Sequence, residues 1–155
     1  MTAPFRYYLR VRYGDCDAQK IVFNARYADY VDIAGFEFFR ALGYRDAMLS
    51  GALDYQVAKL TVEWKASARF DDVLELSIRA TRVGNTSFTL GMEFRIAGSD
   101  RIIATAEVVY VLVEPRSLQK MRIPDDLRAA LESGAAGSVT DHAGFLAPAP
   151  VASGV

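Results

Sequence analysis

Histidine and cysteine are nearly absent from this chain of 155 residues, which contains one of each, His142 and Cys16. Because a Ser-His-Asp or Cys-His site needs an imidazole placed beside its nucleophile, one histidine near the C-terminus argues against both. A zinc site of ordinary composition cannot be assembled from one Cys and one His. Without a neighbouring base, Cys16 is interpreted as a small packed side chain rather than as a nucleophile. We therefore expect no metal and no other cofactor, and any catalytic site to be made of carboxylates.

The chain also lacks an excess of charge of one sign and a long apolar run. Lys and Arg number 18 and Asp and Glu number 19, whereas a dedicated nucleic-acid-binding protein usually shows a basic face. Charges recur through residues 1–15, which therefore have no apolar core of the signal-peptide type, and no stretch reaches the length of a transmembrane helix. A single cysteine fits a reducing compartment. These absences predict a soluble, cytoplasmic protein without a membrane or nucleic-acid partner.

Apolar residues make up 52% of the sequence, enough for one domain with a buried core. From Ser133 onward the chain is rich in Gly, Ala, Ser and Pro. This change in composition predicts a single domain over residues 1–132 and a flexible tail over residues 133–155.

Five segments alternate between apolar and polar residues or run as long apolar stretches, patterns typical of β-strands. They are residues 5–13, 56–65, 73–83, 86–97 and 101–113. Turn-forming residues separate the last four segments, which favours a meander of antiparallel hairpins. The order predicts an α+β fold in which one curved antiparallel sheet wraps a helix between the first two strands.

That helix is indicated by apolar residues at helical spacing from Tyr27 to Leu42. We expect Asn24 to be its N-cap and Gly43 to mark its end. A second, short helix over residues 124–131 would close the domain, with a proline near its first turn.

Two carboxylates, Asp15 and Asp17, lie two residues apart in the loop before the long helix. Backbone N–H groups at a helix N-terminus are free to bind an anion or a polarised carbonyl. A carboxylate beside such donors suits acyl transfer, because the donors stabilise the oxyanion while the carboxylate attacks or activates water. From the residues alone, turn and cap chemistry remains the commoner explanation of an Asp-x-Asp loop.

The loop and the helix together resemble the hotdog thioesterases of the 4-hydroxybenzoyl-CoA thioesterase family and their YbgC-like relatives. The similarity covers roughly residues 5–130 and includes the order of the strands. It implies a hotdog fold, one long central helix wrapped by a five-stranded antiparallel sheet. It also implies hydrolysis of an aryl- or short- to medium-chain acyl-CoA to free acid and CoA. The residues that carry it are Tyr13, Gly14, Asp15, Cys16, Asp17, Ile21, Val22, Phe23, Tyr27, Tyr30, Asp32 and Ala34.

By this resemblance Asp17 is the catalytic residue, either as a nucleophile or as the base that activates water. The N–H of Asn24, or that of its neighbour, would polarise the thioester carbonyl. Asp15 would be structural, binding loop amides and shaping the turn.

The resemblance also indicates where the substrate binds. The acyl group would lie along the helix near Phe23 and Tyr27, although simple core packing also explains these aromatic residues. CoA would cross a subunit boundary and meet the turn that holds Arg82, Asn85 and Ser87. Arg82 would pair with a CoA phosphate, whereas by itself it is a solvated arginine at a strand end.

The sequence departs from the family pattern at four positions. Gln19 and Lys20 stand where relatives often carry glycine, which puts the loop shape and the acyl preference in doubt. Asn24 replaces a histidine of the YbgC-like members, and Gly35 replaces an arginine. Together with Asp32, Gly35 places the chain closer to the aryl-CoA branch. Lys20 is interpreted as an exposed lysine rather than as a phosphate ligand.

A single helix on one sheet leaves the sheet edges and one sheet face open. We therefore expect a homodimer joined edge to edge, and by the resemblance a dimer of dimers. The apolar stretch over residues 101–113 is compatible with such a contact. Two alternatives stay open: a thioesterase that acts on acyl carrier protein, and a hotdog protein that binds acyl-CoA without cleaving it.

Overall fold

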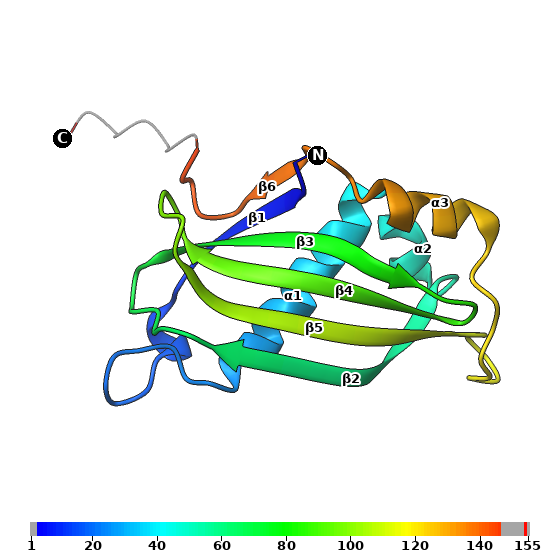
Figure 1. The fold of residues 1–155 in the computed structure, drawn as a ribbon, viewed down its shortest axis with the longest axis horizontal. Helices are drawn as coiled ribbons and strands as arrows, with labels where there is room; N and C mark the ends of the chain where they lie inside the picture. The colour runs from blue at the N-terminus through cyan, green and yellow to red at the C-terminus, as the bar shows by residue number, and fades with distance from the viewer. Residues whose placement is uncertain (1–2, 147–153, 155) are drawn as a thin grey trace.

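The computed structural model describes residues 3–146 and Gly154. Six strands form one sheet in the order β2-β5-β4-β3-β1-β6, and α1 crosses one face of it (Figure 1). Neighbouring strands are antiparallel except β1 and β6, which are parallel. The elements are β1 (Phe5–Arg10), a 3-10 turn (Tyr13–Asp15), α1 (Arg26–Ala41), α2 (Arg45–Ser50), β2 (Asp54–Trp64), β3 (Val73–Val83), β4 (Ser87–Ile96), β5 (Ile102–Val113), α3 (Asp125–Ser133) and β6 (Val139–Asp141).

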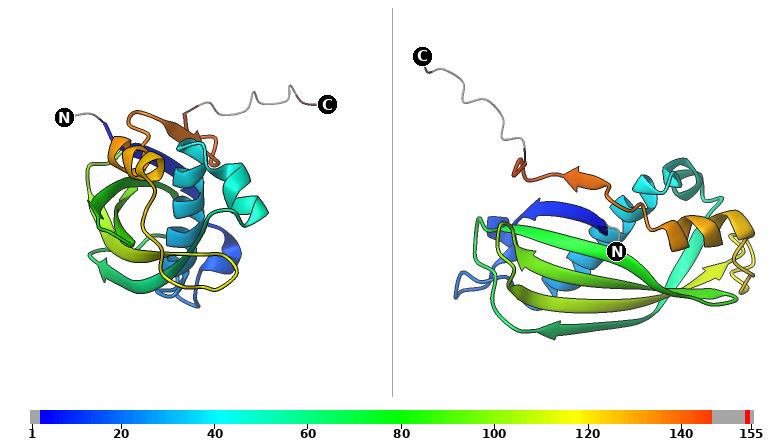
Figure 2. Two further views of the ribbon diagram at one scale, coloured as in Figure 1. Left: turned by 90° about the vertical axis from the view of Figure 1, so that its right-hand side faces the viewer. Right: turned by 45° about the horizontal axis from the view of Figure 1, so that its top comes forward.

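The core lies between α1 and the inner face of the curved sheet, which Figure 2 shows wrapped around the helix. Alternate residues of β3 and β4 are fully buried, as the period of two requires. The helix buries a broad face against them, because apolar residues recur on it every three or four positions. The predicted α+β hotdog architecture, with a central helix and a wrapped antiparallel sheet, is confirmed. The inward-facing side chains are Tyr27, Tyr30, Val31, Ala34 and Phe38 from α1 with Leu74, Leu76, Ile78, Phe88, Leu90 and Phe94 from the sheet.

The predicted meander of the last four strands is wrong for β2. This strand pairs with β5 and forms one edge of the sheet, whereas β3, β4 and β5 do follow one another. The connection over residues 65–72 is not a hairpin turn, because its N–H groups and carbonyls bond elsewhere: the N–H groups of Lys65 and Ala66 both donate to Ile103, and the Ala68 carbonyl accepts from Val22. The chain thus crosses from one edge of the sheet to the other side of β4.

The segment predicted as a flexible tail contains a short strand, β6. β6 adds a parallel strand to β1, in register from Arg6 opposite Val139 to Tyr8 opposite Asp141. The Tyr8 ring stacks on Phe145 with centroids 5.4 Å apart. The edge of β1 and the Tyr8 ring supply the partners that the composition of the segment does not reveal. Residues 147–153 and 155 of the predicted tail lie outside the described residues.

The start of α1 also differs from the prediction. The helix begins at Arg26, and Ala25 occupies the N-cap position with a helical backbone (φ −66°, ψ −21°) and no side-chain cap. Asn24 is therefore not the N-cap; it contributes its carbonyl, which accepts from the Tyr27 N–H at 3.3 Å. Gly43 follows the helix end at φ 92°, as expected for a left-handed stop.

Candidate active site

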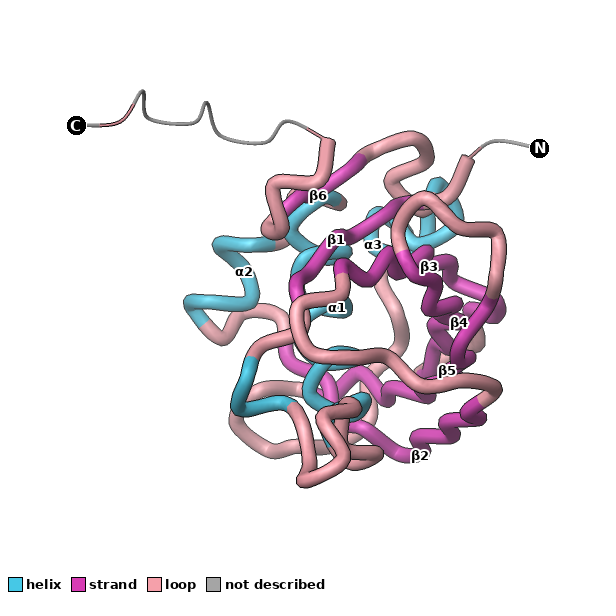
Figure 3. The backbone as a smooth tube through the Cα atoms, turned by 90° about the vertical axis from the view of Figure 1, so that its left-hand side faces the viewer, coloured by secondary structure: helices cyan, strands magenta, loops and turns pink. Residues whose placement is uncertain are grey.

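The chain between β1 and α1 forms a tight loop, and Asp17 lies near its tip. The Asp17 N–H donates to the Ile21 carbonyl at 2.9 Å, and the Asp17 carbonyl accepts from Lys20 at the same distance. The Val22 N–H donates to Ala68, so the crossing connection over residues 65–72 lies beside this loop (Figure 3). Backbone bonds therefore fix the loop from two sides.

The Asp17 side chain is exposed at the rim of a surface pocket of about 500 Å³. Its Oδ1 accepts a 2.8 Å hydrogen bond from the Gln19 N–H. Within residues 3–146 its Oδ2 makes no hydrogen bond, so this oxygen is available to a substrate or to water. Tyr13 and Phe70 form an apolar wall of the pocket, with ring centroids 6.1 Å apart and planes at 88°. The lining residues are Tyr13, Cys16, Asp17, Ala18, Lys20 and Phe70.

Asp15 has the opposite environment, because only 2% of its surface is exposed. Its Oδ2 accepts from the Arg12 N–H at 3.0 Å and from the Tyr30 hydroxyl at 2.9 Å, and the Arg12 guanidinium bonds both carboxylate oxygens. Burial alone would raise the pKa of Asp15, but these donors favour the carboxylate and hold the pKa below its ordinary value. Asp15 thus accepts from a loop amide, as predicted, while its structural role stays a prediction.

Two backbone N–H groups just before α1 are unpaired within residues 3–146. The N–H groups of Asn24 and Ala25 make no hydrogen bond within the described part of the chain. Asn24 lines a small hollow of about 230 Å³, together with Ile21, Val22, Tyr27, Trp64, Lys65, Ala66 and Ser67. This hollow is separate from the pocket at Asp17, so the two predicted catalytic residues do not share one described pocket.

The two aromatic residues predicted to line the acyl site have different surroundings. Tyr27 is 1% exposed and packs against Phe94, with ring centroids 5.3 Å apart, and edge-on against Trp64. Burial raises the pKa of its phenol. Phe23 is 52% exposed, and neither residue lines the pocket at Asp17. In the single chain, Tyr27 packs as a core residue.

Arg82, Asn85 and Ser87 lie around the turn between β3 and β4. Figure 1 shows this turn at the opposite end of the sheet from the loop between β1 and α1. β3 begins opposite Arg10, beside the loop, and runs 11 residues to Val83, about 33 Å at about 3.3 Å per residue. These residues are therefore not brought to the catalytic loop of their own chain.

Three residues near these sites were not singled out by the sequence. Phe70 faces the Asp17 pocket from the connection between β2 and β3. Arg128 of α3 donates to the Gly84 carbonyl at 2.8 Å, on the same turn as Asn85. Trp64, at the end of β2, lines the hollow at Asn24. Each is distant in sequence from the motif, so no local signal could have linked them.

Gly35 has a packing reason to be small. A Cβ at this position would lie 3.2 Å from the Tyr110 hydroxyl, which reaches α1 from β5. Burial raises the pKa values of Tyr110 and Tyr55, and the charge of Asp32 raises both further. The arginine of relatives would not fit here without displacement of Tyr110.

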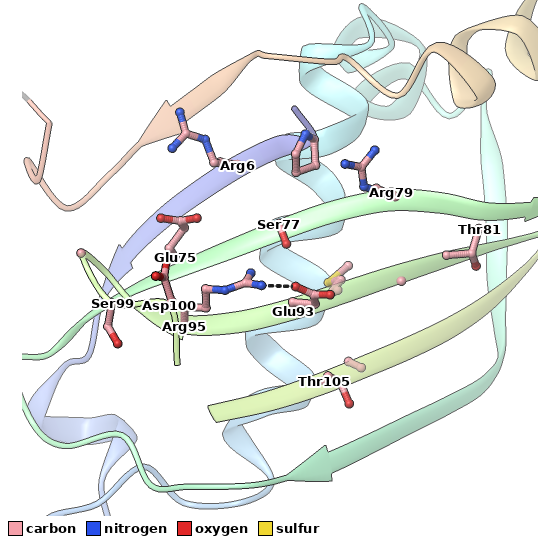
Figure 4. A pocket seen from close by; sticks show the side chains of 15 residues that line it. Arg6, Glu75, Ser77, Arg79, Thr81, Glu93, Arg95, Ser99, Asp100 and Thr105 are labelled. Carbon is pink, nitrogen blue, oxygen red and sulfur yellow. Dashed lines mark hydrogen bonds and ion pairs between the residues drawn. The ribbon is translucent and has the colours of Figure 1, made fainter. Parts of the chain in front are cut away.

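A larger hollow of about 910 Å³ lies on the outer face of the sheet, opposite α1 (Figure 4). Its lining is mainly charged and polar, including Arg6, Glu75, Ser77, Arg79, Glu93 and Arg95, with an ion pair between the last two. It contains none of the predicted site residues. Along β5 the outward positions next to it include Thr105 and the exposed Glu107, so this face is less apolar than the sequence suggested.

A family model described as the thioesterase-like superfamily matches residues 11–131. The chain belongs to the thioesterase-like superfamily. The matched residues include the loop with Asp15 and Asp17, helix α1 and strands β2 to β5, so the predicted resemblance is confirmed at the level of the family.

The chain is also similar to individual proteins and solved structures. The acyl-CoA thioester hydrolase YbgC of Escherichia coli O6:H1 is 30% identical over 129 residues, covering 83% of this chain and 96% of that protein. The gentisyl-coenzyme A thioesterase BH1999 has a TM-score of 0.71 at 27% identity, covering 81% of this chain and 98% of that one. SAV2348 of Staphylococcus aureus, solved in complex with CoA, shares the fold with a TM-score of 0.78 at 11% identity, covering 87% of this chain and 85% of that one.

Two further observations concern metals and membranes. Within residues 3–146 and Gly154, no group of three or more His, Cys, Asp and Glu side chains could hold a metal ion. In the same part of the chain no helix combines the length and the apolar character needed to span a bilayer.

Proposed function

We propose that the protein is an acyl-CoA thioesterase in which Asp17 is the catalytic carboxylate. The observation that carries the proposal is the contrast between the two loop carboxylates. Four donor contacts occupy buried Asp15, whereas Asp17 presents a free oxygen to a pocket with an aromatic wall. The YbgC and BH1999 relatives, which are named for cleaving acyl-CoA thioesters, support the same chemistry here.

The reaction can use the Asp17 carboxylate in two ways. As a nucleophile, it bonds to the thioester carbon, the C–S bond breaks, and CoA leaves as a thiolate that takes a proton from water; a second water then cleaves the acyl anhydride. As a base, it takes a proton from a water molecule that attacks the same carbon directly. Both routes place negative charge on the carbonyl oxygen, to which the unpaired N–H groups of Asn24 and Ala25 would donate hydrogen bonds.

The complete site is proposed to need a second copy of the chain. β2 forms a sheet edge with no neighbour on its outer side among the described strands, and it exposes Val57, Leu60 and Trp64 there. An exposed apolar edge strand is a template for pairing with another strand. Antiparallel pairing of two β2 edges would reverse the partner's sheet. That reversal would bring the partner's turn between β3 and β4 to the end where Asp17 lies.

In this dimer the residues predicted to bind CoA would lie near Asp17 of the partner subunit. CoA bound at Asp17 would extend toward Arg82, Asn85 and Ser87 of the partner subunit, with Arg82 pairing with a phosphate. The acyl group, aryl or of short to medium chain length, would lie in the pocket at Asp17, against Tyr13 and Phe70, rather than beside Phe23 as the resemblance implies. A dimer of dimers and a cytoplasmic location stay predictions from the sequence.

A thiol-release assay tests the proposal. Benzoyl-, phenylacetyl-, butyryl- and octanoyl-CoA are offered to the purified protein, together with the same acyl groups on acyl carrier protein. We expect release of CoA from at least one acyl-CoA, and faster release from CoA than from the carrier protein. Binding of acyl-CoA without release of thiol would contradict the proposal, and so would a preference for the carrier protein.

A further inference from the structure

Lys20 has a backbone conformation that its residue type rarely adopts. Its φ is 60°, in the left-handed region, where residues other than glycine, asparagine and aspartate are uncommon. Two backbone hydrogen bonds hold it there: its N–H donates to Asp17 at 2.9 Å, and its carbonyl accepts from Phe70 at 3.3 Å. Such a position is occupied more easily by glycine, so the backbone of Lys20 is held in a conformation that costs free energy.

The ammonium group of Lys20 has no ion-pair partner within residues 3–146. Lys20 lines the same pocket as Asp17, Tyr13 and Phe70, and the rings of Tyr13 and Phe70 are in contact. The pocket thus combines one carboxylate, one unpaired cation and an apolar wall. This set fits a ligand that is apolar along its length and carries a negative charge.

The size of the pocket indicates which part of the substrate bears that charge. Its volume of about 500 Å³ corresponds to a sphere about 10 Å across. In CoA, thirteen bonds separate the thioester sulfur from the nearest phosphorus, about 16 Å when extended at about 1.25 Å per bond. With the thioester at Asp17, a phosphate therefore lies beyond the reach of this pocket, whereas an acyl group of ordinary size lies within it.

We propose that Lys20 is a specificity-determining residue that binds a carboxylate carried by the acyl group, so that the preferred substrates are carboxylated acyl-CoA thioesters. The proposal rests on the proposed thioesterase function. A second carboxylate brought close to Asp17 is repelled by it, and the Lys20 cation offsets that repulsion. The aromatic rings of Tyr13 and Phe70 would cover the apolar part of the acyl group between the two charged ends.

The test compares matched substrates that differ by one carboxylate: hexanoyl- with adipoyl-CoA, and benzoyl- with 4-carboxybenzoyl-CoA. For each pair, the ratio of kcat/KM for the carboxylated substrate over the neutral one is measured in wild type, Lys20→Gln and Lys20→Gly. We expect both variants to lower this ratio about tenfold, because they remove the cation that binds the carboxylate. A factor of ten corresponds to about 1.4 kcal/mol. Lys20→Gly also suits the backbone at this position, so it keeps the fold.

Leu118→Gly is the matched control, because Leu118 has a similar φ of 57° and lies outside the pocket. It should leave the ratio unchanged. An unchanged ratio in both Lys20 variants would overturn the proposal. Repeating the assay with acyl-pantetheine, which lacks the nucleotide phosphates, provides a second check. If the Lys20 effect vanishes there, the bound anion is a phosphate and the acyl assignment is wrong.

A binding measurement separates this inference from the proposed function. Thioether analogues of hexanoyl- and adipoyl-CoA cannot be hydrolysed, so their Kd values report recognition alone. If the wild type releases no thiol from any substrate, the thioesterase proposal fails. In that case the ratio of the hexanoyl Kd to the adipoyl Kd still tests carboxylate binding. A tenfold lower ratio in Lys20→Gln than in wild type would support it, and the same ratio in both proteins would refute it.

Discussion

The hydroxyl of Tyr30 donates a 2.9 Å hydrogen bond to Oδ2 of Asp15, joining α1 to the loop that carries Asp17. Both groups are buried, and the charge of Asp15 and burial together raise the pKa of Tyr30 well above its ordinary value. This bond fixes the start of the helix relative to the loop.

Removing that donor should destabilise the fold. A hydrogen bond to a charged group contributes about 1.5–3 kcal/mol, so we expect Tyr30→Phe to lower the free energy of unfolding by about 2 kcal/mol. Tyr44→Phe is the control, because its hydroxyl bonds the exposed Asp126 at 3.2 Å, and a surface contact of this kind contributes about 0.5 kcal/mol or less. Urea unfolding of both variants measures the difference; equal losses would contradict the account.

The same carboxylate makes stability depend on pH. The pKa of Asp15 is lowered in the folded protein, so its contribution is complete above the ordinary carboxyl pKa and is lost as pH falls through the lowered value. We expect stability to drop below about pH 4 in wild type. Asp15→Asn should be less stable at pH 7 and should lose less on acidification. Parallel acid curves for the two proteins would show that Asp15 is not responsible.

Phe145 should contribute to stability, although it lies in the segment predicted as a tail. Its ring stacks on Tyr8, and an aromatic pair contributes about 0.5–1.5 kcal/mol beyond its buried area. We expect Phe145→Ala to lower the melting temperature by about 2–4 °C per kcal/mol lost. Leu146→Ala, at an exposed position with no ring contact, should change it little. Equal melting temperatures for both variants and wild type would mean that this segment is not docked in solution.

The proposed dimer predicts that charge on the β2 edge separates the subunits. Val57 is 53% exposed on that edge, and a lysine there places like charges opposite each other. Light scattering should give twice the chain mass of 17.1 kDa for a wild-type dimer, or four times that mass for the predicted dimer of dimers, and half the wild-type mass for Val57→Lys. Thiol release should fall with the dimer. Val139→Lys, on the β6 edge, should keep the mass of wild type; loss of the dimer in that variant instead would place the interface on the other edge.

The sequence predicts well whatever depends on local periodicity. The bounds predicted for the third strand, residues 73–83, are those of β3, because alternation is strong throughout it. The position of β2 beside β5 was missed, since alternation says which face is buried but not which strand is the neighbour. β6 has only three residues, too few to show a period. Phe70 meets Asp17 only through the crossing connection, so its place in the site depends on tertiary structure.

Asp17→Asn is the most direct test of the central claim. Asparagine keeps an oxygen to accept the hydrogen bond from the Gln19 N–H, and the position is exposed, so the melting temperature should stay within about 1 °C of wild type. Asparagine cannot attack as a carboxylate or take a proton from water, so kcat for acyl-CoA hydrolysis should fall by about 10²–10⁴. A folded Asp17→Asn variant that releases thiol at the rate of wild type would contradict the assignment of Asp17 as the catalytic carboxylate.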